Sequence, residues 1–469
     1  MKKFILLSFS FIVISTVAQV STPLPHREAI GEALTLQQIL DSARHNNIAI
    51  RSARQNVEAA TQQRKEAFTK YFPNISGTGL WFNANKGMAQ TSVNPSEAIP
   101  SSLASSLATS LPAEALAALA SPISVSMLKN GTIAGITAMQ PVFAGGQIVN
   151  GNRLAKVGED VARLHLQLSE NEVEKTAEQY YWQLVSLQEK MKTVAAVEDL
   201  LTDIHKDVEV AVRAGLTMSN DLLQVQLRQN EVESQKLKLQ NGISIVKLLL
   251  AQYCGLRDTT FVLNHHTETE IPVTTKHDHQ QALLSTAEYQ LLDKQVEATR
   301  LQRNIEMGKN LPTIAVGAGY NYHNLLDRSI SDCLQGKNNH TFGMIFATVS
   351  VPISEWWGGS HAVKRKKIAY QQAIDEQQDK AELLQIRMQN AWNNVMEARQ
   401  QLLITQRSIK QSEENLRIHR NYYKAGTSTM SDLLEAQLLY QQSCDKHTDA
   451  YADLQNKLVE YRQSVGEKH

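Results

Sequence analysis

Long stretches of the chain place apolar residues alternately three and four positions apart. The first stretch runs from Gly146 to Gly215, and a second follows Gly359. This spacing is typical of coiled-coil helices. At 1.5 Å per residue the first stretch predicts a helix of about 100 Å, and the segment that returns to Gly255 predicts one of about 60 Å. The pattern therefore indicates long helical hairpins rather than a compact helical domain.

The predicted turning points of these hairpins occur twice in the chain. Residues 212–226 and 423–437 share a basic residue, Ala-Gly, a Thr/Ser-rich step and Asp-Leu-Leu. A glycine can adopt the positive φ that ends a helix. The residues expected to cap the following helices are Ser219, Asn220, Ser431 and Asp432. Because Gly255 and Gly466 repeat the 211-residue offset of Gly215 and Gly426, we interpret the chain as an internal duplication.

Each half also has a helical segment that leads into strand-like segments. The helices are expected at 33–71 and 280–309, each ending next to a proline, Pro73 or Pro312. The strands are expected at 74–86, 132–143, 313–323 and 341–353, where period-two alternation is clearest after Pro312. Such strands are long enough to cross a bilayer at a tilt. Two hairpins cannot close a barrel, and open edges cannot lie in lipid, so several chains would have to complete one barrel.

The domain organisation follows from these elements. Residues 1–18 combine Lys2-Lys3 with an apolar run and small residues, which predicts a cleaved signal peptide, with an uncleaved anchor as the alternative. The first repeat spans 19–255 and includes an insertion at 87–131, with short helices expected around 103–111 and 116–119. A linker at 256–279, with a strand candidate at 260–263, leads to the second repeat at 280–469. No later apolar run is long enough for a transmembrane helix.

Charge and composition exclude several classes of function. The net charge is zero, which argues against a nucleic-acid partner. We expect no disulfide framework from three scattered cysteines, Cys254, Cys333 and Cys444. The histidines His265, His266, His277 and His279 have no helical i, i+4 pair, so we interpret them as surface residues. We find no catalytic, cofactor-binding or metal-binding motif, and we expect the protein not to be an enzyme.

In order and spacing, these motifs resemble the TolC-like outer-membrane efflux proteins. The resemblance rests on Tyr71-Phe72-Pro73 before a strand, on 140–146 before the first long helix, and on the two Ala-Gly tips. It implies a mainly α fold with a transmembrane β-barrel. In a homotrimer, four strands per chain would complete a twelve-stranded barrel, and the long coiled-coil hairpins would form an α-barrel.

The resemblance also implies a function and its partners. The chain would be the outer-membrane channel of a tripartite efflux system in a Gram-negative bacterium, with a large periplasmic part. It would passively conduct substrates received from an inner-membrane transporter and a periplasmic adaptor, through an iris-like gate. The alternative is a soluble periplasmic coiled-coil adaptor or scaffold, which should carry other β modules beside a single hairpin.

Three groups of residues take roles from this resemblance. The adaptor-contact tips would be Arg213, Ala214, Gly215, Leu216, Lys424, Ala425, Gly426 and Thr427. The channel gate would consist of Asp432, Glu435, Asp221 and Tyr423, although Ser428 stands where relatives carry an assisting arginine. The membrane interface would include Trp356, Trp357, Lys364, Arg365, Lys366 and Lys367. The alternatives are that the tips only end helices, that Asp432 and Glu435 only stabilise a helix start, and that the basic run is a solvated helix face.

Overall fold

The computed structural model describes residues 34–85, 89–93, 112, 123–127, 130–256, 259, 261–263, 275–324 and 340–467. Several sequence-based predictions lie outside these residues and stay predictions. They concern the signal peptide, the helices of the insertion, His265, His266 and Cys333.

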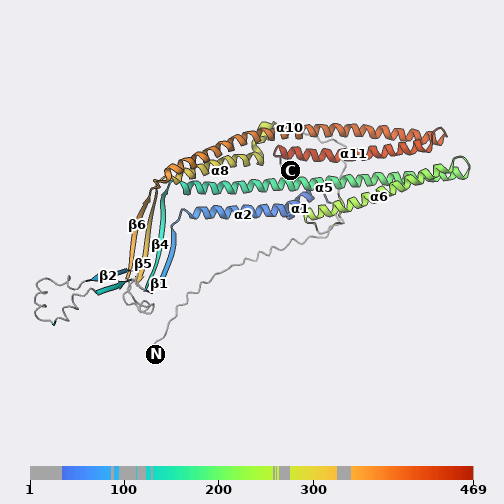
Figure 1. Ribbon diagram of the computed structural model, residues 1–469. Helices are drawn as coiled ribbons and strands as arrows, with labels where there is room; N and C mark the ends of the chain where they lie inside the picture. Colours follow the sequence, from blue (N-terminus) through green and yellow to red (C-terminus); the bar gives the residue numbers. More distant parts are fainter. Residues whose placement is uncertain are drawn as a thin grey trace, which may run out of the picture.

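Two helices run along the whole length of the helical region (Figure 1). They are α5 (Gln147–Arg213, 67 residues) and α10 (Glu355–Lys424, 70 residues). Each turns back at its far end into a shorter helix, α6 (Ser219–Cys254) or α11 (Met430–Ser464). Nearer the strands they are accompanied by α2 (Ile48–Thr69) and α8 (Ala287–Lys309). The predicted pair of long helical hairpins is confirmed.

The two glycine pairs that precede the long helices behave differently. Gly145 and Gly146 have φ of 58° and 75° and form a turn between strand and helix. In contrast, α10 already begins at Glu355, so Gly358 and Gly359 lie inside its first turns. The second glycine pair therefore forms no turn ahead of its helix.

Both helices that precede strands contain a break that the sequence analysis missed. The segment 33–71 is divided at Asn47, which ends α1 (Leu36–Asn46) and begins α2 with an extended ψ of 134°. Its side-chain oxygen accepts a hydrogen bond from the N–H of Ala49 at 2.8 Å, and its Nδ2 donates to the carbonyl oxygen of Tyr253 at 3.1 Å. Apolar spacing alone cannot reveal such a break, because helices on both sides continue the same buried face.

The second half repeats this arrangement at Thr286. This residue ends α7 (His279–Ser285) and begins α8, and its hydroxyl donates to the carbonyl oxygen of Leu283 at 2.7 Å. Each break lies next to the glycine that ends the return helix. Gly255 approaches Asn46, and Gly466 approaches Ser285. The short helices α1 and α7 thus lie against the inner ends of α6 and α11.

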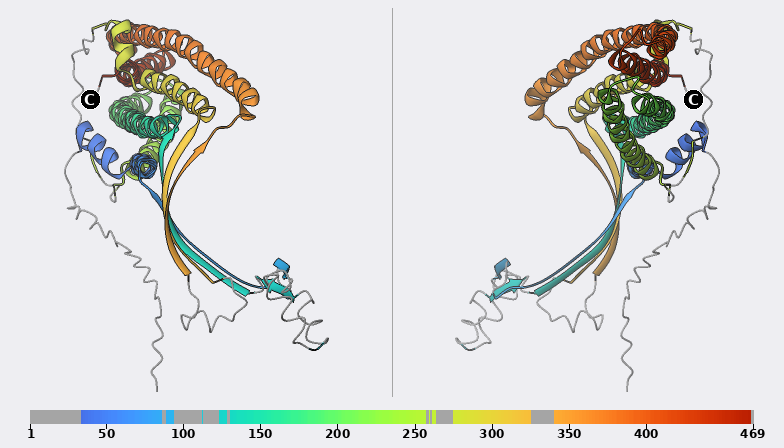
Figure 2. Two further views of the ribbon diagram at one scale, coloured as in Figure 1. Left: turned by 90° about the vertical axis from the view of Figure 1, so that its left-hand side faces the viewer. Right: turned by 90° about the vertical axis from the view of Figure 1, so that its right-hand side faces the viewer.

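The four long strands form one antiparallel sheet. They are β1 (Asn74–Asn83), β4 (Asn130–Ala144), β5 (Thr313–Asn324) and β6 (His340–Ser350), in the order β1-β4-β5-β6. Both predicted hairpin pairings are confirmed, and the β4–β5 pairing joins the two halves. Within the described residues β1 and β6 have a neighbour on one side only. The sheet extends away from the helices and curves along its length (Figures 1 and 2).

One face of this sheet is apolar and uncovered. Ile136 pairs with Tyr320, and Ala318 pairs with Ile345. The exposed fractions are 61% for Ile136, 61% for Tyr320 and 89% for Ile345. Ile75, Trp81 and Val349 lie on the same face by register and are also exposed. The opposite face places polar side chains among its apolar ones, including Ser76, Thr78, Thr137 and Asn321.

The insertion and the linker differ from their predicted forms. Within 87–131, β2 (Ala89–Val93) and β3 (Ile123–Met127) form a second antiparallel pair that we did not predict. In the linker, the expected strand is reduced to a single parallel bridge between Leu34 and Leu263. None of the described helices combines the length and the apolar composition needed to cross a bilayer.

Asn47→Ala should loosen the junction between α1, α2 and α6. The substitution removes a helix cap, which costs about 1 kcal/mol, and leaves the carbonyl oxygen of Tyr253 without its donor. We expect several-fold faster hydrogen exchange in peptides covering 36–50, measured by mass spectrometry. Asn56→Ala on the exposed face of α2 is the matched control. Equal exchange in both variants would contradict the role assigned to Asn47.

Candidate gate and docking site at the hairpin tips

The two hairpin tips have the same backbone geometry. Gly215 and Gly426 both have φ of 72°, in the left-handed region. The following N–H closes each turn: Leu216 donates to the carbonyl oxygen of Ala211, and Thr427 to that of Tyr422, both at 2.9 Å. This is the hydrogen bond of a Schellman motif. The duplicated sequence motif therefore encodes a duplicated helix ending.

The helix starts that follow the two tips are not equivalent. Thr429 caps α11: its hydroxyl accepts from the N–H of Asp432 at 3.2 Å, and Asp432 accepts from the N–H of Thr429 at 2.9 Å. At the matching position before α6 stands Met218, which provides no side-chain cap. The caps expected from the sequence are therefore wrong for Ser219, Asn220 and Ser431, which lie inside the helices.

Asp432 acts as the reciprocal partner in this capping box. One of its carboxylate oxygens accepts from Thr429 and, at 3.1 Å, from the hydroxyl of Ser428. The backbone N–H of Thr429, followed by the two hydroxyls, holds the pKa of Asp432 below its ordinary 3.8. The ionised carboxylate of Asp432 therefore stabilises the start of α11 above about pH 4. This stabilisation is lost as the pH falls through the lowered pKa. Asp432 is ionised at neutral pH, and the neighbouring Glu435 is exposed.

Tyr423 and Asp221 face each other across the two hairpins. The Tyr423 hydroxyl lies 3.5 Å from the carboxylate of Asp221, which also accepts from Thr217 at 2.5 Å. Hydroxyl hydrogen bonds are usually about 2.5–3.0 Å long, so the Tyr423–Asp221 contact is weak. Burial raises the pKa of Tyr423, which keeps its hydroxyl protonated. A second link across the tips, Lys424 to Asp207 at 3.9 Å, is exposed.

A stronger link between the hairpins lies two helical turns further from the tips. Arg228 on α6 is buried, with 7% of its surface exposed. Its Nε donates to Gln437 at 2.9 Å and one Nη to Gln441 at 2.8 Å, both on α11. The other Nη pairs with Glu231 at 2.8 Å. Hydrogen bonds of charged groups contribute about 1.5–3 kcal/mol each, so this network outweighs the contacts at the tips.

The sequence analysis missed Arg228 although it carries a visible signal. Arg228 stands between Val225 and Val232 on the buried stripe of α6, where an apolar residue is expected. Gln437 likewise occupies a fully buried position of α11. A polar residue at a core position of a coiled coil often fixes register or partner, so both positions could have been marked from the sequence.

A groove between the two tips opens to the surface. Its volume is about 930 Å³, and its walls come from α5, α10 and the first turns of α6 and α11. Three apolar residues of the first hairpin line it and are exposed by 65%, 81% and 77%: Val210, Leu216 and Met218. The second hairpin contributes the polar residues Ser428 and Thr429, and its apolar Met430 and Leu433 are each only 1% exposed. The large apolar residues that the groove exposes thus belong to the first hairpin.

The residues assigned to the membrane interface lie at the start of α10. Trp356 donates from its ring nitrogen to the carbonyl oxygen of Asn310 at 3.0 Å and so ties α10 to the end of α8. Trp357 is 78% exposed. Lys366 donates to Gln302 at 3.0 Å. Lys364, Arg365 and Lys367 are exposed on α10.

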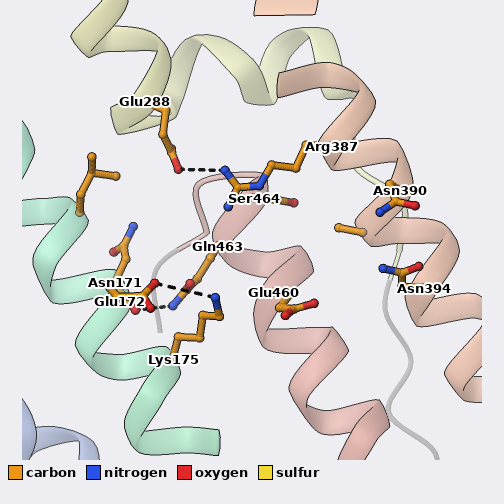
Figure 3. Close-up of a pocket in the computed structure, with 12 residues that line it drawn as sticks. Asn171, Glu172, Lys175, Glu288, Arg387, Asn390, Asn394, Glu460, Gln463 and Ser464 are labelled. Carbon is orange, nitrogen blue, oxygen red and sulfur yellow. Dashed lines mark hydrogen bonds and ion pairs between the residues drawn. The ribbon is translucent and has the colours of Figure 1, made fainter. Parts of the chain in front are cut away.

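Midway along the helices, a cavity of about 410 Å³ lies where the ends of α8 and α11 meet between α5 and α10 (Figure 3). Several of its polar groups are paired with one another. Glu288 lies 3.9 Å from Arg387, Glu172 lies 3.8 Å from Lys175, and Gln463 donates to the carbonyl oxygen of Asn171 at 2.6 Å. We interpret it as the seam between the two repeats.

Among the described residues, no group of three metal-ligating side chains comes together. The described histidines of the linker region, His277 and His279, contact the ring of Tyr461 instead. Cys254 is buried and Cys444 partly buried, and neither forms a disulfide.

Comparisons with known proteins identify the fold. Residues 279–467 match the family model described as outer membrane efflux protein. Over this range the chain is similar to outer membrane efflux proteins. The matched range nearly coincides with the predicted second repeat, and the resemblance to TolC-like proteins is confirmed. No curated protein sequence matches the chain.

Solved structures extend the similarity to both repeats. The outer membrane protein VceC of Vibrio cholerae is 15% identical, with a TM-score of 0.69 over 92% of this chain and 96% of that one. The CmeC outer membrane channel of Campylobacter jejuni is 14% identical, with a TM-score of 0.69 over 94% and 90%. The open MtrE outer membrane channel of Neisseria gonorrhoeae is 12% identical, with a TM-score of 0.69 over 92% and 89%. The fold class predicted from the sequence is confirmed.

Exchanging the residues that precede α6 and α11 should exchange the stability of the two tips. Thr429→Met removes the cap of α11, at a cost of about 1 kcal/mol. Met218→Thr supplies a hydroxyl three residues before Asp221 and should stabilise α6 by a similar amount. Hydrogen exchange should become faster in 428–434 for the first variant and slower in 217–223 for the second. Unchanged exchange in both variants would contradict the capping analysis.

Proposed function

We propose that the chain forms, as a homotrimer, the outer-membrane channel of a tripartite efflux system. The observation that carries this function is the shared fold of both repeats with outer membrane channels, together with the open edges of the sheet. The apolar sheet face of Ile136, Tyr320 and Ile345 would contact lipid in the outer membrane. The long helices would extend into the periplasm.

The edges of the chain support a closed ring of identical copies. One edge consists of β1, α2 and α6, and the other of β6 and α10. Unpaired strand edges are not stable in lipid, so β1 of one copy would pair with β6 of the next. Exposed apolar residues continue along both helical edges. They are Leu223, Leu227, Leu237, Ile245 and Leu248 on α6, and Ile368, Leu383 and Ile386 on α10.

This channel would conduct passively and perform no covalent chemistry. The energy for transport would come from an inner-membrane transporter. The alternative of a soluble coiled-coil adaptor receives no support from the comparisons, because the matched family and folds are those of outer membrane proteins.

The tips would contact the periplasmic adaptor. The apolar wall formed by Val210, Leu216 and Met218 offers a surface for the apolar face of a helical tip. The basic residues Arg213 and Lys424 flank the same region. Of these, Arg213 is held by Glu209 at 2.5 Å within its own helix.

The gate would open when the paired hairpins move apart. In a trimer Asp432 and Glu435 would place six carboxylates near one another, and such a ring attracts cations. The long Tyr423–Asp221 contact would close the tips only weakly, because Ser428 replaces the arginine of relatives and binds Asp432 instead. The Arg228 network would therefore carry most of the closing force.

The ring can be tested through α6. Leu237→Glu combined with Ile245→Glu places charges on residues that are 61% and 48% exposed in one chain. If the trimer buries them, each loses about 1.5–3 kcal/mol of apolar burial, and native mass spectrometry in mild detergent should show monomers. The wild type and the neighbouring Lys238→Glu should remain trimeric. A wild-type protein that is monomeric and needs no detergent would disprove the channel function.

The gate can be tested by single-channel conductance in planar bilayers. Arg228→Leu removes the donors of Gln437 and Gln441, and buried unpaired groups cost about 1–3 kcal/mol each, so conductance should rise. Glu231→Gln keeps the contacts to α11 and should resemble the wild type. Tyr423→Phe, which removes the contact to Asp221, should raise the conductance less than Arg228→Leu does. A larger effect of Tyr423→Phe than of Arg228→Leu would show that the tips, not the Arg228 network, hold the gate.

A further inference from the structure

A basic pocket lies between α2 and α5, close to where these helices meet the strands. Its volume is about 660 Å³. Four basic residues contribute to its wall: Arg64, Lys65, Arg153 and Lys156. Phe68, Tyr71 and Val149 form an apolar side. The pocket therefore combines positive charge with an apolar surface.

The positive charge of this pocket is not neutralised within the described part of the chain. Glu159, which is 3% exposed, is shared by Arg64 at 2.8 Å and Arg163 at 2.6 Å. Two guanidinium groups thus face one carboxylate. No carboxylate of a described residue lies within ion-pair distance of Lys65, Arg153 or Lys156. This excess of positive charge would suit an anion with more than one negative charge. It would also suit a single anionic group that belongs to a densely charged surface.

The apolar side continues towards the strands as a cluster of aromatic rings. Phe68 packs edge to face against Tyr71 and Phe72, with ring centroids 5.6 and 5.5 Å apart. All three rings are exposed, by 53%, 40% and 56%. β1 begins two residues after Phe72. Aromatic residues are enriched where a membrane protein crosses from lipid to water. In the proposed channel this cluster would therefore lie at the interface between the membrane and water.

The pocket opens on the outer side of the helical layer. Lys156 lies 18 residues before Glu174, which is five helical turns and thus the same face of α5. Glu174 pairs with Arg44 of α1 at 2.6 Å, so this face carries α1. A conducting tunnel has room for an added helix only on its outside. A ligand would therefore reach the pocket from the membrane or the periplasm rather than from the lumen.

We propose that this pocket binds an anionic phospholipid of the periplasmic leaflet. Lys65, Arg153 and Lys156 would contact the phosphodiester, and an acyl chain would lie along Phe68 and Tyr71. Basic pockets between helices at membrane level are suited to anionic headgroups. The inference rests on the proposed outer-membrane function, since only that function brings the pocket to a lipid surface. A bound lipid would hold α2 and α5 at a fixed depth.

The test is native mass spectrometry of the full chain, purified in detergent and supplied with phosphatidylglycerol, phosphatidylethanolamine or inorganic phosphate. The wild type should retain phosphatidylglycerol in preference to phosphatidylethanolamine. Arg153→Gln with Lys156→Gln should weaken this retention by about 10-fold or more, because each basic residue near an anionic lipid contributes to binding. The matched control is Lys206→Gln with Lys238→Gln, two exposed lysines far along the helices, which should retain the lipid.

Two outcomes would overturn the lipid site. Equal retention of phosphatidylglycerol by the wild type and the Arg153/Lys156 variant would show that the pocket is not the site. Displacement of the lipid by an equal concentration of inorganic phosphate would show a site for free anions. Phe68→Asn further distinguishes a phospholipid from free phosphate as the ligand. It should weaken lipid retention and leave phosphate binding unchanged. If the proposed channel function were wrong, the result would differ from both of these outcomes. The wild type would then not be recovered as a detergent-bound trimer.

Discussion

The backbone groups along the open edges of β1 and β6 are the constraint on which the rest of the structure depends. An unpaired N–H or C=O group in hydrocarbon costs several kcal/mol, and each edge strand presents a row of them. The described part of one chain does not satisfy these groups, because its sheet ends at β1 on one side and at β6 on the other. In the proposed trimer, closing the edges by rotation would place α2 and α6 of one copy beside α10 of the next. The same closure would then account for the apolar stripe on α6 and the exposed apolar residues of α10.

Duplication explains the backbone of the two hairpins, and divergence explains how they differ. Gly215 and Gly426 adopt the same φ, so the turn is preserved. The side chains around the turns are not: Met218 stands where Thr429 caps α11, and Gln226 is exposed where Gln437 is buried. The first tip is thus the more apolar and the less firmly capped, whereas the second is fixed by its own hydrogen bonds. An adaptor that approaches both tips would meet two different surfaces.

The sequence reveals the parts of this fold that depend on periodicity and fails where single side chains decide. Coiled-coil spacing predicts α5, α6, α10 and α11, and period-two alternation predicts the four strands and their pairing. The breaks at Asn47 and Thr286 escape such patterns, because each depends on hydrogen bonds to residues close in space, such as Tyr253 for Asn47. The proposed gate shows the same limit. The motif locates Tyr423 and Asp221, but only the structure shows that their contact is long and that Arg228 provides the stronger link.

The position of Arg228 determines how such a gate can work. Exposed ion pairs such as Lys424–Asp207 contribute about 0–1 kcal/mol, and the Tyr423–Asp221 contact is too long to add much. The segments between Arg228 and the tips can therefore separate at little cost in free energy. At Arg228 itself, α6 and α11 stay joined by buried hydrogen bonds. Wider opening has to break the bonds of Arg228 to Gln437 and Gln441. A partner can drive that step only if it binds the open tips more tightly than the closed ones by at least the free energy of those bonds. The exposed apolar residues Leu216 and Met218 could supply this difference in binding free energy. As the groove widens around a docked helix, more of their surface would be buried.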